Sequence, residues 1–254
     1  MGRNGRRIIE TQQFTVHDDR CAMKVGTDAL LLGAWTELNG AQSIVDIGTG
    51  SGILLLMLAQ RADKGTRLIG VELQSDAFEQ ACNNLEASPF HGEMEQGDAL
   101  AWLDASAGRG ERFDLLVCNP PFFRDKPLGP DQARNLARHD ASMPIEKLLT
   151  SAERVLNDGG RLCLVWPDDR MPELSQAAHQ AKLRISEDCQ IHGHPEARPL
   201  RHLLVLRPWH TSAVQPPTQS TLIIEDGPRM PGKPPRYSRA YRSLLAPYFP
   251  GLSA

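Results

Sequence analysis

The chain has 254 residues, of which 41% are hydrophobic, and a formal net charge of −3. This length is sufficient for one α/β domain with a full hydrophobic core. No apolar stretch is long enough to cross a bilayer, and the arginine-rich opening Met1 to Arg7 is not followed by a signal-type apolar core, so we expect a cytoplasmic protein.

The cysteines and histidines argue against a disulfide framework and against a metal site. The five cysteines are odd in number and include no Cys-x-x-Cys spacing. His192 and His194 have no third ligand near them in the sequence, so we expect no bound metal.

The first predicted helix runs from Asp28 to Leu38, capped by Thr27 or Asp28. Its apolar face would cover one side of a sheet. Lys24 and Asp28 allow two interpretations. They are surface charge and a helix cap, or they belong to a segment that closes over a bound cofactor.

A buried strand at 43–47 is followed by a glycine-rich loop and by an apolar helix at 53–59. The loop glycines follow a G-x-G-x-G pattern: Gly48, Gly50 and Gly52. Glycines permit positive φ and close backbone approach, and a helix N-terminus presents unpaired N–H groups. The combination predicts a cradle for a nucleotide cofactor, with Asp46 placed to anchor an α-amino group.

A second strand, 67–71, ends at Glu72, whose carboxylate could accept hydrogen bonds from both hydroxyls of a ribose. A third strand, 93–96, leads into Asp98 and Ala99. The same spacing would also suit a dinucleotide fold, although the loop lacks the last spacing of G-x-G-x-x-G.

The strand 113–118 runs directly into Asn119-Pro120-Pro121-Phe122. Proline fixes φ and pushes the preceding residue to an extended conformation, so the tandem prolines hold the neighbouring carbonyls rigidly. The Asn119 carboxamide oxygen and the Pro120 carbonyl could accept the two hydrogens of an exocyclic amine, and Phe122 could stack on a base. The alternative is a strand that ends in a Pro-Pro turn and a buried phenylalanine.

The remaining elements follow in chain order. The polar segment 123–143 suits a substrate loop better than a core. A helix opens at Pro144 and runs to Leu156, the turn 157–160 ends it, and a strand covers 161–166. We then expect a helix at 171–181 and a terminal hairpin of strands at 183–191 and 202–206.

Basic residues form three groups along the sequence. If the groups converge around Asn119, they would hold phosphates; otherwise they are ordinary solvated side chains. They are Arg3, Arg6 and Arg7; Arg124, Lys126, Arg134, Arg138 and His139; and Arg229, Lys233, Arg236, Arg239 and Arg242.

The order of these motifs resembles the class I S-adenosylmethionine-dependent methyltransferases, in the amino-methylating branch with an [Asn/Asp/Ser]-Pro-Pro-aromatic signature. Within that class, Cys21–Trp35, the glycine loop and Tyr237–Tyr241 resemble the tRNA1(Val) adenine-N6 methyltransferase family. The resemblance extends from about Phe14 to Phe249. It is weakest in 195–217 and 227–235, which are rich in proline and glycine.

The resemblance implies a Rossmann-like fold, with a doubly wound, mostly parallel seven-stranded sheet and a C-terminal antiparallel hairpin. It implies an N-terminal segment and helix (1–40) that cover the cofactor site, a methyltransferase core (41–210) and a basic, proline-rich extension (211–254) within the same domain. We expect a monomer.

The resemblance also implies S-adenosylmethionine as cofactor and tRNA as partner, with methylation of the adenosine 3′ of the anticodon in tRNA1(Val). The implied cofactor residues are Lys24, Thr27, Asp46, Gly48, Gly50, Gly52, Glu72, Leu73, Asp98 and Ala99, with Asp98 accepting from the adenine amine. The implied catalytic residues are Asn119, Pro120, Pro121 and Phe122. The implied RNA contacts are Arg124, Arg138, Arg236, Arg239 and Arg242.

Three other functions stay open. The first is methylation of another planar amine, such as a protein glutamine or an rRNA base. The second is a nicotinamide-dependent oxidoreductase, which would leave Asn-Pro-Pro-Phe unexplained. The third is a catalytically silent RNA-binding module, against which the intact Asp46, Glu72 and Asn119 argue.

Overall fold

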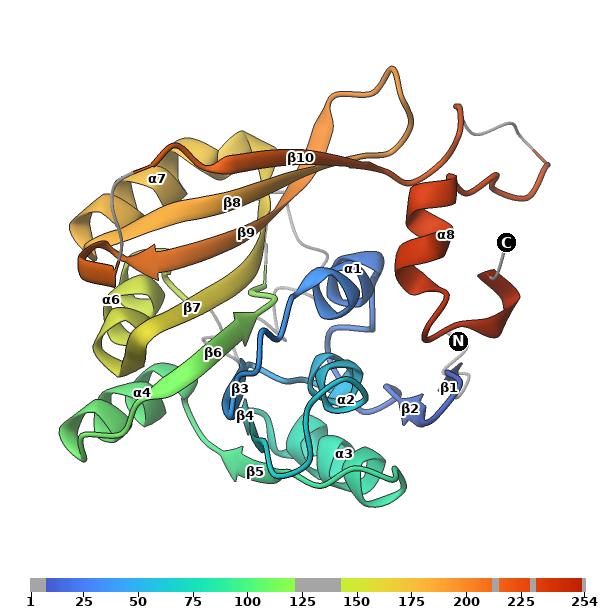
Figure 1. Ribbon diagram of the computed structural model, residues 1–254. Helices are drawn as coiled ribbons and strands as arrows, with labels where there is room; N and C mark the ends of the chain where they lie inside the picture. The colour runs from blue at the N-terminus through green and yellow to red at the C-terminus, as the bar shows by residue number, and fades with distance from the viewer. Residues whose placement is uncertain (1–7, 122–142, 212–214, 229–231, 253–254) are drawn as a thin grey trace, which may run out of the picture.

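The computed structural model describes residues 8–121, 143–211, 215–228 and 232–252, which form a central sheet with helices on both faces (Figure 1). In the described chain, the eight strands of this sheet lie in the order β10, β8, β9, β7, β6, β3, β4, β5. Their bounds are β3 Ser43–Ile47, β4 Arg67–Glu72, β5 Glu93–Gln96, β6 Phe113–Cys118, β7 Leu156–Pro167, β8 Leu183–His192, β9 Pro199–Pro208 and β10 Thr218–Ile223.

Only β9 runs antiparallel to its neighbours β7 and β8; the other pairs of this sheet are parallel. From β3 the chain first moves outward to β4 and β5, and then returns to place β6 on the other side of β3. The strand order therefore reverses between β3 and β6. In open α/β sheets, ligands bind at such a switch point, outside the carboxyl ends of the strands.

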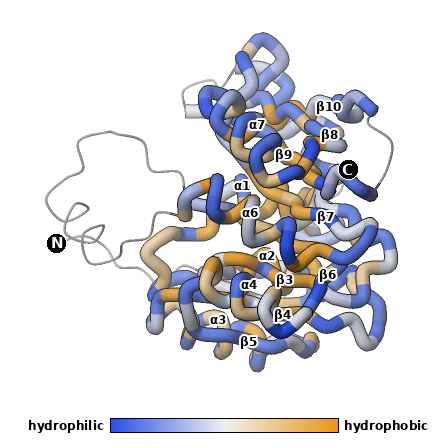
Figure 2. The backbone as a smooth tube through the Cα atoms, turned by 90° about the vertical axis from the view of Figure 1, so that its left-hand side faces the viewer, coloured by the Kyte–Doolittle hydropathy of each residue, from blue (hydrophilic) through white to orange (hydrophobic). Residues whose placement is uncertain are grey.

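Two hydrophobic layers enclose the sheet. Along β7, Cys163 and Val165 face one layer while Leu162 and Leu164 face the other, as the two-residue period of a strand requires. The first layer includes α1 Thr27–Trp35, α2 Ile53–Ala59, α3 Ser75–Glu86 and α8 Arg239–Leu245. The second includes α4 Ala99–Gly108, α6 Ile145–Val155 and α7 Met171–Gln180. Figure 2 shows hydrophobic stretches in the interior around α2, β3 and β6.

The predicted helix at 53–59 is confirmed as α2, and all seven of its residues are buried. Helix α1 packs closely against it at Gly33, where a Cβ atom would lie 2.9 Å from the Met57 Sδ. A larger side chain at Gly33 would force Met57 or the helices to shift, so the glycine permits this close approach of α1 to α2.

The expected cap of α1 is wrong. Gly26 is the N-cap, with extended backbone and no side-chain cap bond, and the helix ends at Trp35 rather than Leu38. Asp28 does not cap the helix because its carboxylate forms an ion pair with Arg201 of β9 at 3.1 Å. A charge partner from a strand distant in sequence thus replaces the local interaction.

The predicted helices at 144–156 and 171–181 are confirmed as α6 and α7, and Pro144 is the N-cap of α6. The separate turn at 157–160 is wrong, because β7 begins at Leu156 and continues through these residues with an irregular register opposite Phe113 and Leu115. Gly160 permits this path, since a Cβ there would lie 2.9 Å from the Phe113 carbonyl oxygen.

The antiparallel hairpin is confirmed as β8 and β9, but it is not terminal. β10 pairs in parallel with β8 and adds an eighth strand to the expected seven. A small N-terminal hairpin, β1 Ile8–Glu10 with β2 Thr15–His17, was also not expected.

Three short 3₁₀ helices complete the described elements: η1 Asp168–Arg170, η2 Trp209–Thr211 and η3 Pro250–Leu252. The C-terminal extension enters the first hydrophobic layer through Tyr241, Leu245 and Tyr248, and the Tyr248 hydroxyl donates to the Met57 carbonyl at 3.0 Å. None of the helices in the described residues is long and apolar enough to span a membrane.

Candidate active site

The carboxyl ends of β3, β4 and β6 lie side by side, because these strands are parallel and adjacent. They carry Asp46, Glu72 and, directly after β6, Asn119. The topology thus brings together residues separated by more than twenty positions in the sequence. Pro120 is buried, while Asn119 and Pro121 are half-buried. Phe122, Arg124 and Arg138 lie outside the described residues.

Asp46 lies at the base of the site, with 1% of its surface exposed. Its Oδ2 accepts from the Thr49 hydroxyl at 2.5 Å and from the Leu55 N–H at 3.2 Å. Burial raises the pKa of this carboxyl to about 7, since a charged group loses hydration, although both hydrogen bonds act in the opposite direction. A cationic ligand beside Asp46 would offset the lost hydration.

The glycine loop holds Gly48, Gly50 and Gly52 at φ values of +70°, +58° and +81°. These left-handed conformations are easy for glycine and strained for other residues. A Cβ built on Gly50 would meet no atom within 4 Å among those described, so open space lies beside the loop. The loop can therefore accept a ligand in close contact with its backbone.

Glu72 fixes the shape of this loop. Its Oε2 accepts from the Gly50 N–H at 2.9 Å and its Oε1 accepts from the Gln74 N–H at 2.8 Å. A carboxylate offers about four lone-pair positions, so each oxygen can still accept one further bond. The two free positions suit a pair of adjacent hydroxyls.

Asp98 is the N-cap of α4, and its Oδ1 accepts from the Ala101 N–H at 2.9 Å. One carboxylate oxygen therefore serves the helix, and the other is the candidate for a ligand. Ala99 is buried, and Leu73, next to Glu72, is 44% exposed. An apolar side chain left open beside Glu72 is suited to contact a flat ring.

Met143 packs between the loop and the end of β6. Its Sδ lies 3.9 Å from the Cys118 Sγ, and its Cε would lie 4.0 Å from a Cβ on Gly48. Burial raises the pKa of the Cys118 thiol, so it remains a neutral, apolar group in this contact. No local pattern predicts this role of Met143, because the contact depends on how the chain returns before α6.

Residues 14–26, which we term the N-terminal strap, run from β2 to the start of α1. Within the strap, the Lys24 ammonium donates to the carbonyls of Asp18, Asp19 and Cys21 at 2.7, 3.0 and 3.0 Å. An ammonium has three N–H donors, so these bonds use all of them. Lys24 organises the strap, and its contact with a cofactor stays a prediction, as does that of the exposed Thr27.

Two buried residues of α3 that the sequence analysis missed hold the strap in place. The Gln80 carboxamide accepts from the Arg20 N–H at 2.9 Å and donates to the Asp19 carboxylate at 2.7 Å. The Asn84 side chain accepts a hydrogen bond from the His17 N–H and donates one to the His17 carbonyl. The signal was present in the pattern of α3, because these polar residues share a helix face with Ala77 and Ala81, all buried at spacings of three and four.

The basic C-terminal residues lie beyond β10. Arg236 and Arg239 are exposed, Arg242 is half-buried, and α8, which carries two of them, lies beside α1 (Figure 1). Whether all three predicted basic groups converge stays a prediction, because residues 1–7 and 122–142 lie outside the described residues.

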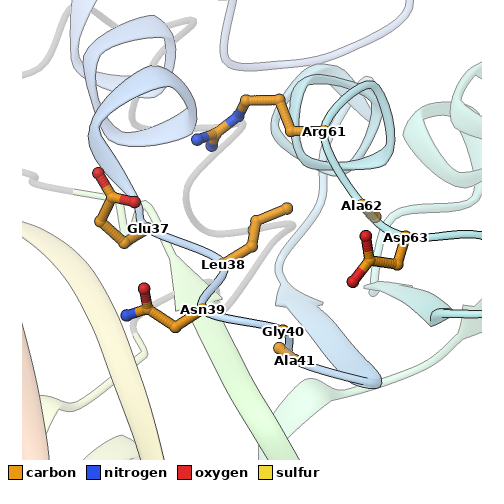
Figure 3. A pocket seen from close by; sticks show the side chains of 8 residues that line it. All are labelled: Glu37, Leu38, Asn39, Gly40, Ala41, Arg61, Ala62 and Asp63. Carbon is orange, nitrogen blue, oxygen red and sulfur yellow. The ribbon is translucent and has the colours of Figure 1, made fainter.

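A hollow of about 280 Å³ at the opposite edge of the sheet is lined by residues 37–41 and 61–63 (Figure 3). Arg61 fixes one wall by donating to the Gly33 and Thr36 carbonyls at 2.6 and 2.8 Å. The hollow lies at the amino end of β3, away from Asp46, and none of the predicted site residues lines it. In the part of the chain that the structure describes, no cluster of three or more His, Cys, Asp or Glu side chains could hold a metal.

Comparison with known proteins identifies relatives over most of the chain. Residues 21–177 match the model of the methyltransferase small domain family. The chain is 38% identical over 248 residues, 95% of its length and 94% of the relative's, to the tRNA1(Val) (adenine(37)-N6)-methyltransferase of Porphyromonas gingivalis. It is 40% identical to the protein of that name from Phocaeicola vulgatus, over 77% of this chain and 82% of the relative.

A solved structure supports the same fold. A predicted O-methyltransferase from Agrobacterium tumefaciens superposes with a TM-score of 0.62 at 20% identity, over 87% of this chain and 96% of that one. The sheet order, the switch point and these similarities agree. The chain therefore belongs to the methyltransferase small domain family and, within it, to the family of tRNA1(Val) (adenine(37)-N6)-methyltransferases.

Proposed function

We propose that this protein transfers a methyl group from S-adenosylmethionine to the exocyclic N6 amine of an adenosine in tRNA, at the position named in its relatives, adenine 37 of tRNA1(Val). The observation that carries the proposal is the placement of Asn119 and Pro120 at the end of β6, beside a buried carboxylate and an open glycine loop. An acceptor pair for an amine thus lies next to a cradle for the methyl donor.

The residues at the switch point fit the cofactor. Asp46 would hold its α-amino group, because a cation offsets the cost of burying that carboxylate. Glu72 has a free position on each oxygen for the two ribose hydroxyls. Leu73 would contact the adenine ring, and Asp98, with the Ala99 N–H nearby, would hold the adenine amine. When bound, the cofactor supplies a methyl group already activated by its sulfonium.

The amine of adenine is a poor nucleophile because its lone pair is delocalised into the ring. The enzyme therefore has to position the nitrogen in line with the methyl group and exclude water, rather than supply a strong base. The Asn119 carboxamide oxygen and the Pro120 carbonyl accept from the NH₂ group. This favours a pyramidal nitrogen and stabilises the positive charge that develops on it.

The base has to leave its stack to reach this pair of acceptors, as in other enzymes that modify bases. We assign base stacking to Phe122, and contacts to RNA phosphates to Arg124, Arg138, Arg236, Arg239 and Arg242. An enzyme acting on tRNA would work in the cytoplasm, and we propose that it acts as a monomer.

The test is methylation of total RNA from a strain that lacks this protein. We expect S-adenosylmethionine-dependent formation of N6-methyladenosine in one tRNA species, identified by mass spectrometry of nucleosides and of nuclease fragments. Asn119→Ala protein is the control for contaminating activity. Methyl transfer to a protein glutamine or to rRNA, with tRNA left unmodified, would refute the substrate assignment and leave the cofactor assignment in place.

A further inference from the structure

The turn between β8 and β9 lies beside the chain that follows β10. β8 and β10 run in the same direction as β6, so both end at the edge of the sheet where Asn119 lies. The Ile224 N–H donates to the His192 carbonyl and the Glu225 N–H to the Gly193 carbonyl, both at 2.9 Å. We term residues 192–201, 224–228 and 232–239 together the hairpin arm, which projects at the upper right of Figure 1.

Further bonds hold the arm in one shape. The Asp226 N–H donates to the Arg236 carbonyl at 2.8 Å, and the Ser238 N–H donates to the Ile224 carbonyl at 2.9 Å. The Tyr237 ring stacks on Tyr241 of α8, with ring centres 4.7 Å apart. Side chains on such a surface are presented by a fixed backbone.

The base of the arm touches the element that follows the strap. Arg201 pairs in β9 with Pro167, the last residue of β7, and its guanidinium contacts the Asp28 carboxylate at the start of α1 at 3.1 Å. The base of the arm is therefore tied to α1, the helix that follows the N-terminal strap.

Positive charge is concentrated on the arm. Its residues include five lysines and arginines against three acidic residues, in a protein whose net charge is −3. Four of these basic residues are exposed and form no ion pair with another described residue: Arg198, Lys233, Arg236 and Arg239. Such cations lose little on contact with phosphates, since no ion pair with a described residue has to be broken.

We infer that the hairpin arm is an RNA-docking surface, in which Arg198 of the β8–β9 turn acts together with Lys233, Arg236 and Arg239. The inference rests on the proposed function and extends it, because the turn adds a contact that lies outside the basic C-terminal tail. Its occupant is the phosphate backbone of the substrate RNA, held by charge and without reading of bases.

The test compares two double variants of the full-length protein that each remove two positive charges. Arg198→Gln/Arg236→Gln changes one residue on each side of the arm. Lys64→Gln/Arg112→Gln is the matched control, because both residues are exposed and precede β4 and β6 at the opposite edge of the sheet. The substrate is unmodified tRNA, assayed with saturating S-adenosylmethionine over a range of salt concentrations.

We expect the arm variant to raise the KM for tRNA about tenfold and to make the slope of log affinity against log salt shallower by about 1 to 2, whereas the control matches the parent. Affinity for S-adenosylmethionine and thermal stability stay at parent values in both. Arg198→Lys/Arg236→Lys keeps the charge and should keep the salt slope. If the glutamine variant has the salt slope of the parent protein, the inference that the hairpin arm docks RNA is wrong, and a protein partner becomes the candidate for this surface. If the parent protein itself methylates no RNA, the proposed function is wrong.

Discussion

The Asn84 side chain of α3 donates from Nδ2 to the Ser51 carbonyl of the glycine loop at 2.8 Å. The same Nδ2 donates to the His17 carbonyl at 2.8 Å, and the Asn84 Oδ1 accepts from the His17 N–H at 3.0 Å. The Asn84 side chain, in a residue with 2% of its surface exposed, therefore joins the glycine loop to the N-terminal strap. The glycine loop and the N-terminal strap therefore have one common anchor.

Replacement of Asn84 by leucine, which has a similar volume, should weaken cofactor binding as well as stability. It leaves three backbone groups without their partner, and each buried unsatisfied group costs about 1–3 kcal/mol. We expect the free energy of unfolding to fall by about 2–4 kcal/mol and the affinity for S-adenosylmethionine to fall about tenfold. Urea unfolding and calorimetry measure the two effects.

The matched control is Asn83→Leu, which alters the exposed asparagine next to it on the same helix. It should leave both quantities near parent values. Unchanged cofactor affinity in a folded Asn84→Leu protein would show that the loop keeps its shape without this anchor.

Gly50→Ala should reduce cofactor affinity far more than it reduces stability. The backbone at Gly50 has φ +58°, and a Cβ there meets no described atom within 4 Å. The free energy of unfolding should therefore fall only by the cost of placing an alanine in the left-handed conformation, about 1–2 kcal/mol. The added methyl group would occupy the space in which we place the cofactor. Gly110→Ala is the control, because Gly110 also has positive φ, at +74°, and open surroundings. Equal cofactor affinity in the two variants would remove the loop from the binding site.

The raised pKa of Asp46 makes both stability and cofactor affinity depend on pH. The folded pKa of about 7 exceeds the ordinary value of 3.8, so the folded protein retains this proton while the unfolded chain releases it. The contribution of Asp46 to stability is therefore greatest at low pH and falls as pH rises from about 4 to about 7. Above that range it no longer changes.

Cofactor binding should show the opposite trend, because the cofactor's ammonium requires the carboxylate. We expect affinity for S-adenosylmethionine to rise from about pH 6 to about pH 8, with release of a proton on binding near neutral pH. Calorimetry in buffers of different ionisation enthalpy counts that proton. Binding without proton release near pH 7 would exclude Asp46 as the anchor of the α-amino group.

The elements that the sequence predicts best are those whose pattern is local. The apolar runs of β3, β6 and β7 become the centre of the sheet, and the apolar run at 53–59 becomes a fully buried α2. The glycines of the loop take positive φ, as their role requires. For these segments, the local sequence pattern alone is enough to predict both the element and its burial.

The elements that the sequence did not predict depend on distant partners. β10 is an edge strand with four exposed residues in succession, and it is defined by its pairing with β8 rather than by an alternating pattern. Asp28 is an ion-pair partner of Arg201 instead of a helix cap. Lys24 binds carbonyls of its own strap. In each case a tertiary contact, which has no signature in the local sequence, decides the role of the residue.

Asn119 is the residue on which the proposed chemistry depends. Asn119→Ala should lower kcat by about 10²–10³, because one preorganised acceptor at a developing charge is lost. Affinity for S-adenosylmethionine and thermal stability should change little, since Asn119 is half-buried and follows the last residue of β6. Single-turnover methylation of tRNA measures the chemical step without product release.

Asn119→Asp distinguishes the role of this residue more sharply. An aspartate keeps an acceptor oxygen and loses the amide donor, so partial activity is expected if the oxygen accepts from the amine. If the amide N–H₂ were the group required, aspartate would be as inactive as alanine. Asn83→Ala, on the surface of α3, controls for the loss of an asparagine elsewhere. A parent rate in Asn119→Ala would reduce the Asn-Pro-Pro-Phe segment to the end of a strand, and the acceptor site would have to be sought on other residues of the same edge.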